Sequence, residues 1–84
     1  SQDIPPYIIA GKEPTRYAGI NLVGLRRHGF SNDLIDLIHN AYRMLYSEGI
    51  LAEGIKKIKS ELQITPEIQY IIDFVSSSKR GIIR

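Results

Sequence analysis

Apolar residues recur every three or four positions from about residue 22 to residue 75, and this spacing predicts a series of amphipathic helices. We expect a short helix at about 22–28, longer helices at about 32–47 and 51–62, and a fourth helix that begins at Pro66. Each long helix should bury one apolar stripe: Leu34, Ile38, Ala41 and Leu45 (flanked by Ile35, Leu37 and Tyr42), then Leu51, Ile55, Ile58 and Leu62, then Ile68, Ile71, Ile72 and Val75.

Residues with strong preferences for helix ends stand between these stripes. Ser31 is placed to cap the second helix, and Thr65 followed by Pro66 is a start signal for the fourth. Gly29 should close the short helix in a left-handed conformation, with Phe30 folding back in a Schellman motif. The two isoleucines of the C-terminal "RGIIR" should dock on the rest of the fold.

The first 20 residues have a different character, because they contain three of the four prolines. The pair Pro5-Pro6 favours an extended backbone, and residues 7–10 read as a short strand that ends in a turn at Gly11. We expect this strand to have no partner elsewhere in the chain. The prediction is therefore an all-α fold, a small bundle of about four helices over residues 21–84, preceded by an extended segment over residues 1–20.

Length and composition narrow the possibilities. The chain has 84 residues and no cysteine, so it forms at most one domain without disulfides or thiolate metal sites. No apolar run approaches the roughly 20 residues that a membrane span needs. Because the first residue is Ser1 and the only methionine is Met44, we expect a piece of a longer protein.

The net charge of +2 is unevenly distributed along the chain. The first 30 residues hold the whole excess, with Lys12, Arg16, Arg26 and Arg27 set against Asp3 and Glu13. Broad basic surfaces are typical of nucleic-acid binders, and this footprint is small. It suits a single phosphorylated ligand or an acidic patch on a protein.

No catalytic constellation stands out, so we predict no catalytic residue and no metal ligand within this chain. The two histidines are His28 and His39, and His39 falls on the polar side of its helix. No Gly-rich phosphate loop and no HExxH motif is present. Asp33 and Asp36 lie near a helix start, where carboxylates offset the helix dipole.

Arg26, Arg27 and His28 follow one another at the end of the short helix, and two interpretations remain open. Cations in a last turn offset the helix dipole. Three in succession point in different directions, however, so one favourable end position does not account for all of them. An arginine also matches a phosphate in geometry and charge. Asn21 either caps the same helix or hydrogen-bonds a base or sugar.

Four segments in order resemble a known family: "DIPPYIIAG", "GINLVGLRRHGFS", "AYRMLY" and "RGIIR". Together they are similar to the C-terminal domain of the acyl-[acyl-carrier-protein]–UDP-N-acetylglucosamine O-acyltransferases. The similarity runs from Asp3 to Arg84.

The resemblance implies a homotrimeric cytoplasmic enzyme in which a left-handed parallel β-helix precedes a small helical domain. Such enzymes need no cofactor and move a 3-hydroxyacyl chain from acyl carrier protein to the 3-hydroxyl of UDP-N-acetylglucosamine, the first step of lipid A synthesis. The general base is a histidine on the β-helix, so this chain alone would be inactive. Its extended segment would be the exit from the last β-helical coil.

The resemblance also implies roles for particular residues. Asn21 and Arg27 would approach the nucleotide, together with His28, which stands where many relatives have a second arginine. Val23 stands where some relatives carry a glutamate. Arg26 and Arg43 would face acyl carrier protein, which is acidic.

Two other functions fit parts of the pattern. An independent helical module that binds an acidic protein surface would explain the charged faces without any ligand. A small nucleic-acid binder would use residues 22–28 as a basic helix.

Overall fold

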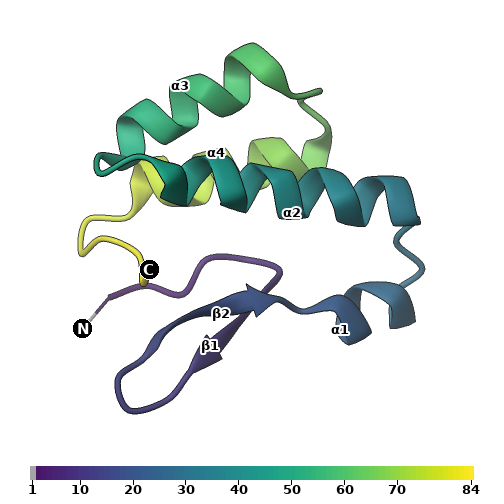
Figure 1. Ribbon diagram of the computed structural model, residues 1–84, viewed down its shortest axis with the longest axis horizontal. Helices are drawn as coiled ribbons and strands as arrows, with labels where there is room; N and C mark the ends of the chain where they lie inside the picture. Colours follow the sequence, from purple (N-terminus) through teal and green to yellow (C-terminus); the bar gives the residue numbers. More distant parts are fainter. Residues whose placement is uncertain (1) are drawn as a thin grey trace.

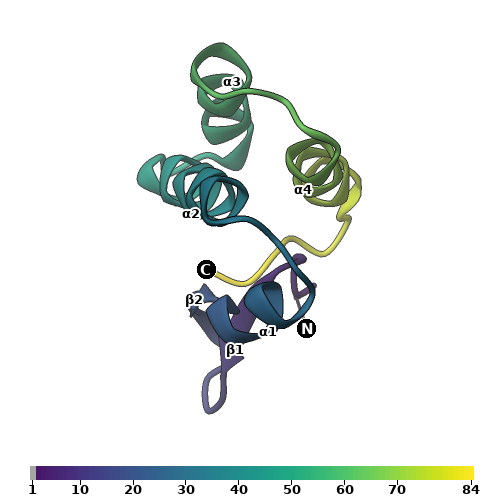
Figure 2. The same ribbon diagram turned by 90° about the vertical axis from the view of Figure 1, so that its right-hand side faces the viewer.

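The computed structural model describes residues 2–84 and shows a hairpin, a short helix and three longer helices (Figure 1). In chain order the elements are β1 (Ile8–Gly11), β2 (Arg16–Ile20), α1 (Leu22–Arg27), α2 (Asn32–Ser47), α3 (Leu51–Glu61) and α4 (Pro66–Ser77). The long helix α2 is central: α3 and α4 pack against it, and the hairpin and α1 lie on the side away from α3 (Figures 1 and 2). The predicted fold class, a bundle of four helices after an extended segment, is confirmed.

The expectation that the first strand has no partner is wrong. β1 pairs antiparallel with β2, and its partners include Ile8 with Ile20 and Ala10 with Tyr17. Between these two pairs β2 has two intervening residues and β1 has only one, so β2 bulges, and Gly19 at φ 100° lies in the bulge. The bulge breaks the alternation of side chains along β2, which hid this strand in the sequence.

The helix ends follow their predicted signals. Ser31 Oγ accepts a hydrogen bond from the backbone N–H of Leu34 at 3.1 Å. Thr65 Oγ1 accepts one from the N–H of Ile68 at 3.3 Å, with Pro66 at the first helical position. Both caps lie in the extended region of backbone space, as caps normally do. No helix of the described chain is long and apolar enough to cross a membrane.

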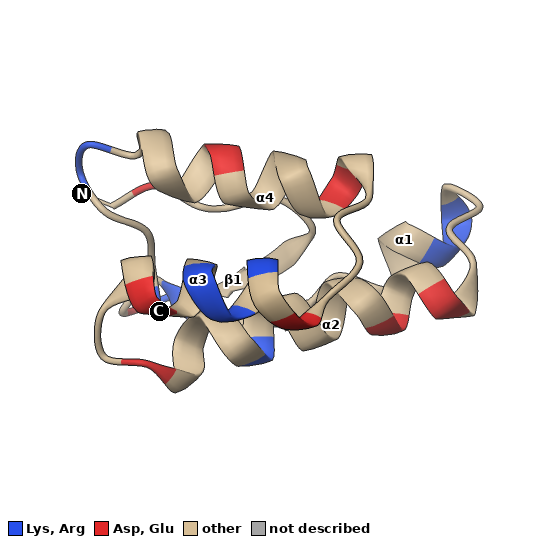
Figure 3. Cartoon of the chain, turned by 90° about the horizontal axis from the view of Figure 1, so that it is seen from above, with Lys and Arg blue, Asp and Glu red and all other residues tan. Residues whose placement is uncertain are grey.

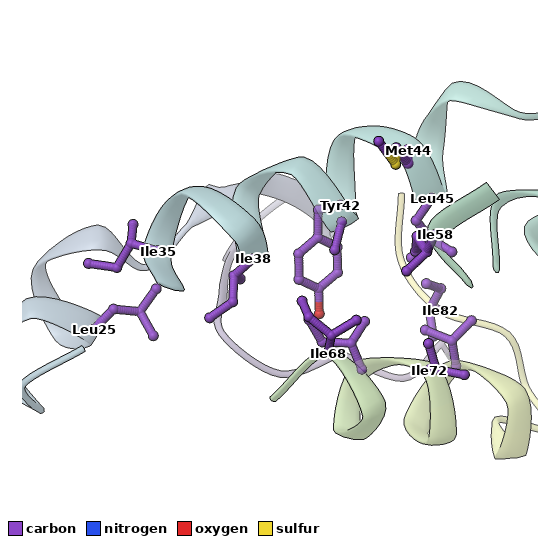
Figure 4. Packing of buried hydrophobic residues seen from close by; sticks show 13 residues of the cluster. Leu25, Ile35, Ile38, Tyr42, Met44, Leu45, Ile58, Ile68, Ile72 and Ile82 are labelled. Carbon is purple, nitrogen blue, oxygen red and sulfur yellow. The ribbon is translucent and has the colours of Figure 1, made fainter. Parts of the chain in front are cut away.

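The core lies around α2 (Figure 4). The predicted stripe of α4 is confirmed in full, since Ile68, Ile71, Ile72 and Val75 are all buried. On α2 the buried face is wider than predicted: Ile35, Ile38, Ala41, Tyr42, Met44 and Leu45 are buried, and Leu34 is half-buried. The face is wide because α2 is covered from two sides.

The contact between α2 and α3 is closest at Gly54. A Cβ atom at this position would lie 2.6 Å from the backbone oxygen of Leu45, so only glycine allows this approach of the two helices. Of the predicted α3 stripe, Ile58 is fully buried, and Leu51, Ile55 and Leu62 are half-buried.

The two ends of the chain meet in what we call the terminal clamp, formed by Asp3, Ser78, Arg80 and Ile82. Asp3 and Ile82 form a parallel β-bridge. The Asp3 carboxylate accepts hydrogen bonds from Ser78 Oγ at 2.7 Å and from Arg80 Nη2 at 2.5 Å. These bonds, the Ser78 bond foremost, lower the pKa of the Asp3 carboxyl. Ile82 and Ile83 are buried, so the prediction that they dock is confirmed.

Two tyrosines of α2 hold the extended segment and the tail. The Tyr42 hydroxyl donates to the carbonyl of Pro6 at 2.5 Å, and the Tyr46 hydroxyl donates to the carbonyl of Ile83 at 2.7 Å. Both rings contact the ring of Tyr17 from β2. Burial raises the pKa of Tyr42, and it raises that of Tyr46 to about 12, so both remain hydrogen-bond donors at ordinary pH. The first 20 residues are thereby packed on the helical core.

Candidate functional site: the two faces of α1

The start of α1 is fixed by the hairpin. The backbone N–H of Asn21 donates to the carbonyl of Tyr7 at 2.8 Å, which joins the residue before α1 to the residue before β1. Tyr7 itself has φ 69°, a left-handed conformation that costs energy for a residue with a side chain. The side chain of Asn21 caps α1 by accepting from the N–H of Gly24 at 3.1 Å.

The end of α1 is the predicted Schellman motif. The N–H of Phe30 donates to the carbonyl of Leu25 at 3.1 Å, and the N–H of Gly29 donates to that of Arg26 at 3.0 Å. Gly29 has φ 78°, as a left-handed closing residue requires. Arg26 and Arg27 lie in the last turn, beside the acidic beginning of α2 (Figure 3). The motif fixes the backbone from which both basic side chains leave the helix.

One face of α1 borders an open hollow of about 300 Å³, which we call the Asn21 hollow. Its lining residues are Tyr7, Asn21, Gly24, Leu25, His28 and Phe30. The rings of Tyr7 and Phe30 are in contact, with centroids 5.8 Å apart, and Tyr7 also meets the ring of Tyr70 at 6.0 Å. The hollow thus combines aromatic and aliphatic walls with two polar side chains, Asn21 and His28, a composition typical of ligand pockets.

Tyr7 and His28 contribute in different ways to this hollow. Burial raises the pKa of the Tyr7 phenol, with a smaller contribution from Glu67, so the ring stays neutral. His28 lies with Nδ1 2.8 Å from the carbonyl oxygen of Gly24. Because a carbonyl only accepts, Nδ1 must carry the hydrogen. The second ring nitrogen, Nε2, has no hydrogen-bond partner within residues 2–84.

The adjoining face of α1 borders a second hollow of about 490 Å³, which we call the Arg26 hollow. Ile20, Leu22, Arg26, Asn32, Ile35, Asp36 and His39 line it. Its lining combines apolar side chains with an amide, a guanidinium, a carboxylate and an imidazole. This hollow can meet a charged surface better than it can enclose a small molecule.

The structure separates the residues proposed from sequence. Asn21 and His28 lie together in the Asn21 hollow, whereas Arg26 lies in the other. Arg27 is exposed and lines neither hollow. Arg43 is exposed on α2, where its Nη2 is 3.4 Å from Asn40 Oδ1, and it too lines neither hollow. All five assignments remain predictions.

Sequence reasoning missed four residues of the Asn21 hollow, namely Tyr7, Gly24, Leu25 and Phe30 as lining groups. Tyr7 is remote in sequence and comes to the hollow through the pairing of β1 with β2, so no local pattern indicated it. Gly24 did offer a signal, because a glycine inside a six-residue helix is costly. Among residues 2–84 no group of three or more His, Asp or Glu side chains is placed to hold a metal ion.

Known proteins resemble this chain along its whole length. The profile of the family described as UDP-N-acetylglucosamine O-acyltransferase, domain 2, matches residues 3–83. A relative from Sulfurihydrogenibium sp. (strain YO3AOP1), named acyl-[acyl-carrier-protein]–UDP-N-acetylglucosamine O-acyltransferase, is 49% identical over 82 residues, which cover 96% of this chain and 30% of the relative. A relative of the same name from Syntrophobacter fumaroxidans is 37% identical and is covered to 33%.

Solved structures agree with these relatives. The UDP-N-acetylglucosamine acyltransferase of Bacteroides fragilis superposes with a TM-score of 0.94 at 56% identity, covering 100% of this chain and 33% of that one. The UDP-N-acetylglucosamine O-acyltransferase of Moraxella catarrhalis superposes with a TM-score of 0.86 at 34% identity, covering 99% of this chain and 33% of the other. The chain spans about a third of the length of these relatives. With the matched profile extending over residues 3–83, this chain belongs to the UDP-N-acetylglucosamine O-acyltransferase family and corresponds to the family's domain 2.

Proposed function

We propose that this chain is the C-terminal helical domain of a UDP-N-acetylglucosamine 3-O-acyltransferase, and that it contributes contacts to the nucleotide sugar and to acyl carrier protein. The parent enzyme moves a 3-hydroxyacyl chain from acyl carrier protein to the sugar 3-hydroxyl in the first step of lipid A synthesis. It acts in the cytoplasm as a homotrimer and without a cofactor.

The observation that carries this proposal is the Asn21 hollow in a chain of this family. In this proposal a flat base would lie between the apolar side chains of Tyr7, Leu25 and Phe30 and the polar groups of Asn21 and His28, which all line the hollow. The diphosphate of such a ligand would lie outside the hollow, where the exposed Arg27 can meet it. A guanidinium suits that position because it binds phosphate oxygens through paired hydrogen bonds.

Arg26 and Arg43 form the side that would face acyl carrier protein. Arg26 lines the Arg26 hollow and Arg43 is exposed on α2, so neither competes for the nucleotide. Replacing both by glutamate should raise the KM for acyl carrier protein substrates and leave the KM for the nucleotide sugar unchanged. Steady-state kinetics with each substrate varied in turn checks this, and a change confined to the nucleotide sugar would reverse the assignment.

The chemistry requires a general base, which in this proposal is a histidine on the β-helix of the parent enzyme. In acyl transfer the sugar oxygen attacks the thioester carbonyl, its proton goes to the base, and the carrier thiol leaves. We therefore assign the base to a part of the parent outside these 84 residues, so the purified chain should release no thiol from acyl carrier protein in a thiol-release assay.

Arg27→Ala tests the nucleotide assignment. In the parent enzyme it should weaken UDP-N-acetylglucosamine binding by about 1.5–3 kcal/mol, the usual worth of a hydrogen bond to a charged group. Isothermal titration calorimetry measures the change. Lys59→Ala on the exposed face of α3 removes the same charge far from the hollow and should have no effect. Equal affinities for Arg27→Ala and the unchanged enzyme would exclude Arg27 from the site.

A further inference from the structure

Gly24 is bonded to both polar side chains of the Asn21 hollow. Its backbone N–H donates to Asn21 Oδ1 at 3.1 Å. Its carbonyl accepts from His28 Nδ1 at 2.8 Å. A single residue in the middle of α1 therefore holds the amide on one side and the imidazole on the other.

The absence of a side chain at Gly24 is what makes room for the Asn21 amide. A Cβ atom at position 24 would lie 2.5 Å from Asn21 Nδ2 and 2.9 Å from its Cγ. Gly24 does not have a positive φ, so its backbone conformation is one that alanine adopts freely. Glycine costs about 0.8–1 kcal/mol relative to alanine inside a helix. Glycine at position 24 thus makes α1 less stable than alanine would, and it leaves room for the Asn21 amide over the first turn of the helix.

Capping alone does not require this arrangement. Ser31 and Thr65 cap α2 and α4 with ψ values of 157° and 167°, and they bond to the N–H groups of Leu34 and Ile68, which carry large side chains. Asn21 instead has φ −80° and ψ 72°. Its amide lies over residue 24, and both residues line the hollow.

The bonds to Gly24 leave one atom of each side chain available. Asn21 uses Oδ1 for the cap, and its Nδ2 has no hydrogen-bond partner in the described chain. His28 uses Nδ1, which leaves Nε2 without a partner within residues 2–84. The hollow thereby presents an amide N–H donor and a ring nitrogen, two groups that can bond the polar edge of a pyrimidine base.

We propose that Gly24 is a positioning residue of the nucleotide site, which acts by holding the Asn21 amide in its place in the hollow. This inference rests on the proposed function for the identity of the ligand. Gly24 does not touch the ligand in this proposal. Its contribution passes entirely through Asn21, because an alanine would leave the carbonyl that holds His28 intact.

Gly24→Ala in the parent enzyme is the test, with UDP-N-acetylglucosamine titrated by calorimetry. We expect the affinity to fall about fivefold to tenfold, as for one or two neutral hydrogen bonds. Gly54→Ala is the matched control, because Gly54 is also a helical glycine with no room for a Cβ atom. There the crowding atoms belong to the backbone of Leu45. Gly54→Ala should lower thermal stability and leave the affinity of the folded enzyme unchanged. Gly49→Ala, with open space around it, should change neither.

A second pair of variants isolates the role of Asn21. Asn21→Ser keeps a capping hydroxyl and removes the amide. In that background Gly24→Ala should cause no further loss of affinity and should raise the melting temperature, because alanine is the better helix former. This double variant should fold even if Gly24→Ala does not. An equal loss of affinity from Gly24→Ala in both backgrounds, or no loss in either, would overturn the proposal.

A measurement without ligand separates this inference from the proposed function. In NMR spectra of the 84-residue chain, Gly24→Ala should shift the side-chain amide resonances of Asn21, and His28 should remain in its Nδ1–H tautomer. If the parent enzyme does not bind UDP-N-acetylglucosamine, the proposed function fails while shifted Asn21 resonances still support the positioning role. Unshifted resonances would refute the positioning role whatever the ligand.

Discussion

The terminal clamp and the Asn21 hollow use polar side chains in opposite ways. At the clamp, both carboxylate oxygens of Asp3 are bonded within the chain, to Ser78 and to Arg80. At the hollow, Asn21 and His28 each bond Gly24 with one atom and keep another available. Polar groups that are satisfied internally hold the fold, whereas groups left half-used on a rigid support are suited to a ligand.

The same contrast separates the aromatic residues. Tyr42 and Tyr46 are linked by hydrogen bonds to the extended segment and the tail. Tyr7 and Phe30 line an open hollow, and their rings contact each other on its wall. If the comparison is right, changes at the first pair alter stability and changes around the hollow alter binding.

The largest effect on stability should come from Tyr42→Ala. Tyr42 is 0% exposed, and losing its ring should lower the free energy of unfolding by about 3–5 kcal/mol. Urea unfolding of the chain followed by circular dichroism measures it. Tyr42→Phe, which removes only the bond to Pro6, should cost less. If Tyr42→Ala unfolded at the same urea concentration as the unchanged chain, Tyr42 would not stabilise the fold and the contrast between the two groups of aromatic residues would be wrong.

Asp3→Asn should have a smaller effect that depends on pH. The folded-state pKa of Asp3 is lowered, first by the Ser78 hydrogen bond and then by Arg80, so the ionised carboxylate stabilises the fold. This contribution is present above the ordinary carboxyl pKa of about 3.9 and is lost as pH falls through the lower folded value. The unchanged chain and the Asp3→Asn variant should therefore differ in the urea concentration at the unfolding midpoint at pH 7, and this difference should shrink towards about pH 3. A constant gap would show that the Asp3 charge contributes nothing to the clamp.

His28→Ala should have the smallest effect on stability. The side chain is exposed and its one bond within the described residues is to the Gly24 carbonyl, so the free energy of unfolding should change by no more than about 0.5 kcal/mol. Thermal unfolding of the chain provides the measurement. A loss as large as that of Tyr42→Ala would mean that His28 belongs to the fold and not to a site.

The helices could be predicted because their signals are local. The caps at Ser31 and Thr65, the proline at Pro66 and the left-handed Gly29 each act within a few residues, and all four were read correctly. The stripe of α4 followed from spacing alone. On α2 the spacing of the predicted stripe was right, but the predicted buried face was too narrow. The number of elements that pack against a helix cannot be predicted from the sequence of that helix alone.

The hairpin and the clamp could not be read in the same way. The bulge at Gly19 breaks the alternation of β2, and the loop between the strands lacks the Asn-Gly or Asp-Gly signal of a tight hairpin. Asp3 and Ser78 are 75 residues apart, and no pattern links them. The candidate site could not be predicted in full for the same reasons, because Tyr7 is remote in sequence and reaches the Asn21 hollow through the hairpin.

The pairing of Asp3 with Ile82 has a topological consequence. Because the two ends of the described chain run side by side, a short peptide linker could join them and turn the fold into a closed ring. The exposed residues 12–15 between β1 and β2 then offer a place to reopen it. Such a circular permutant would keep α1, α2 and the Asn21 hollow unchanged while presenting new termini at the tip of the hairpin.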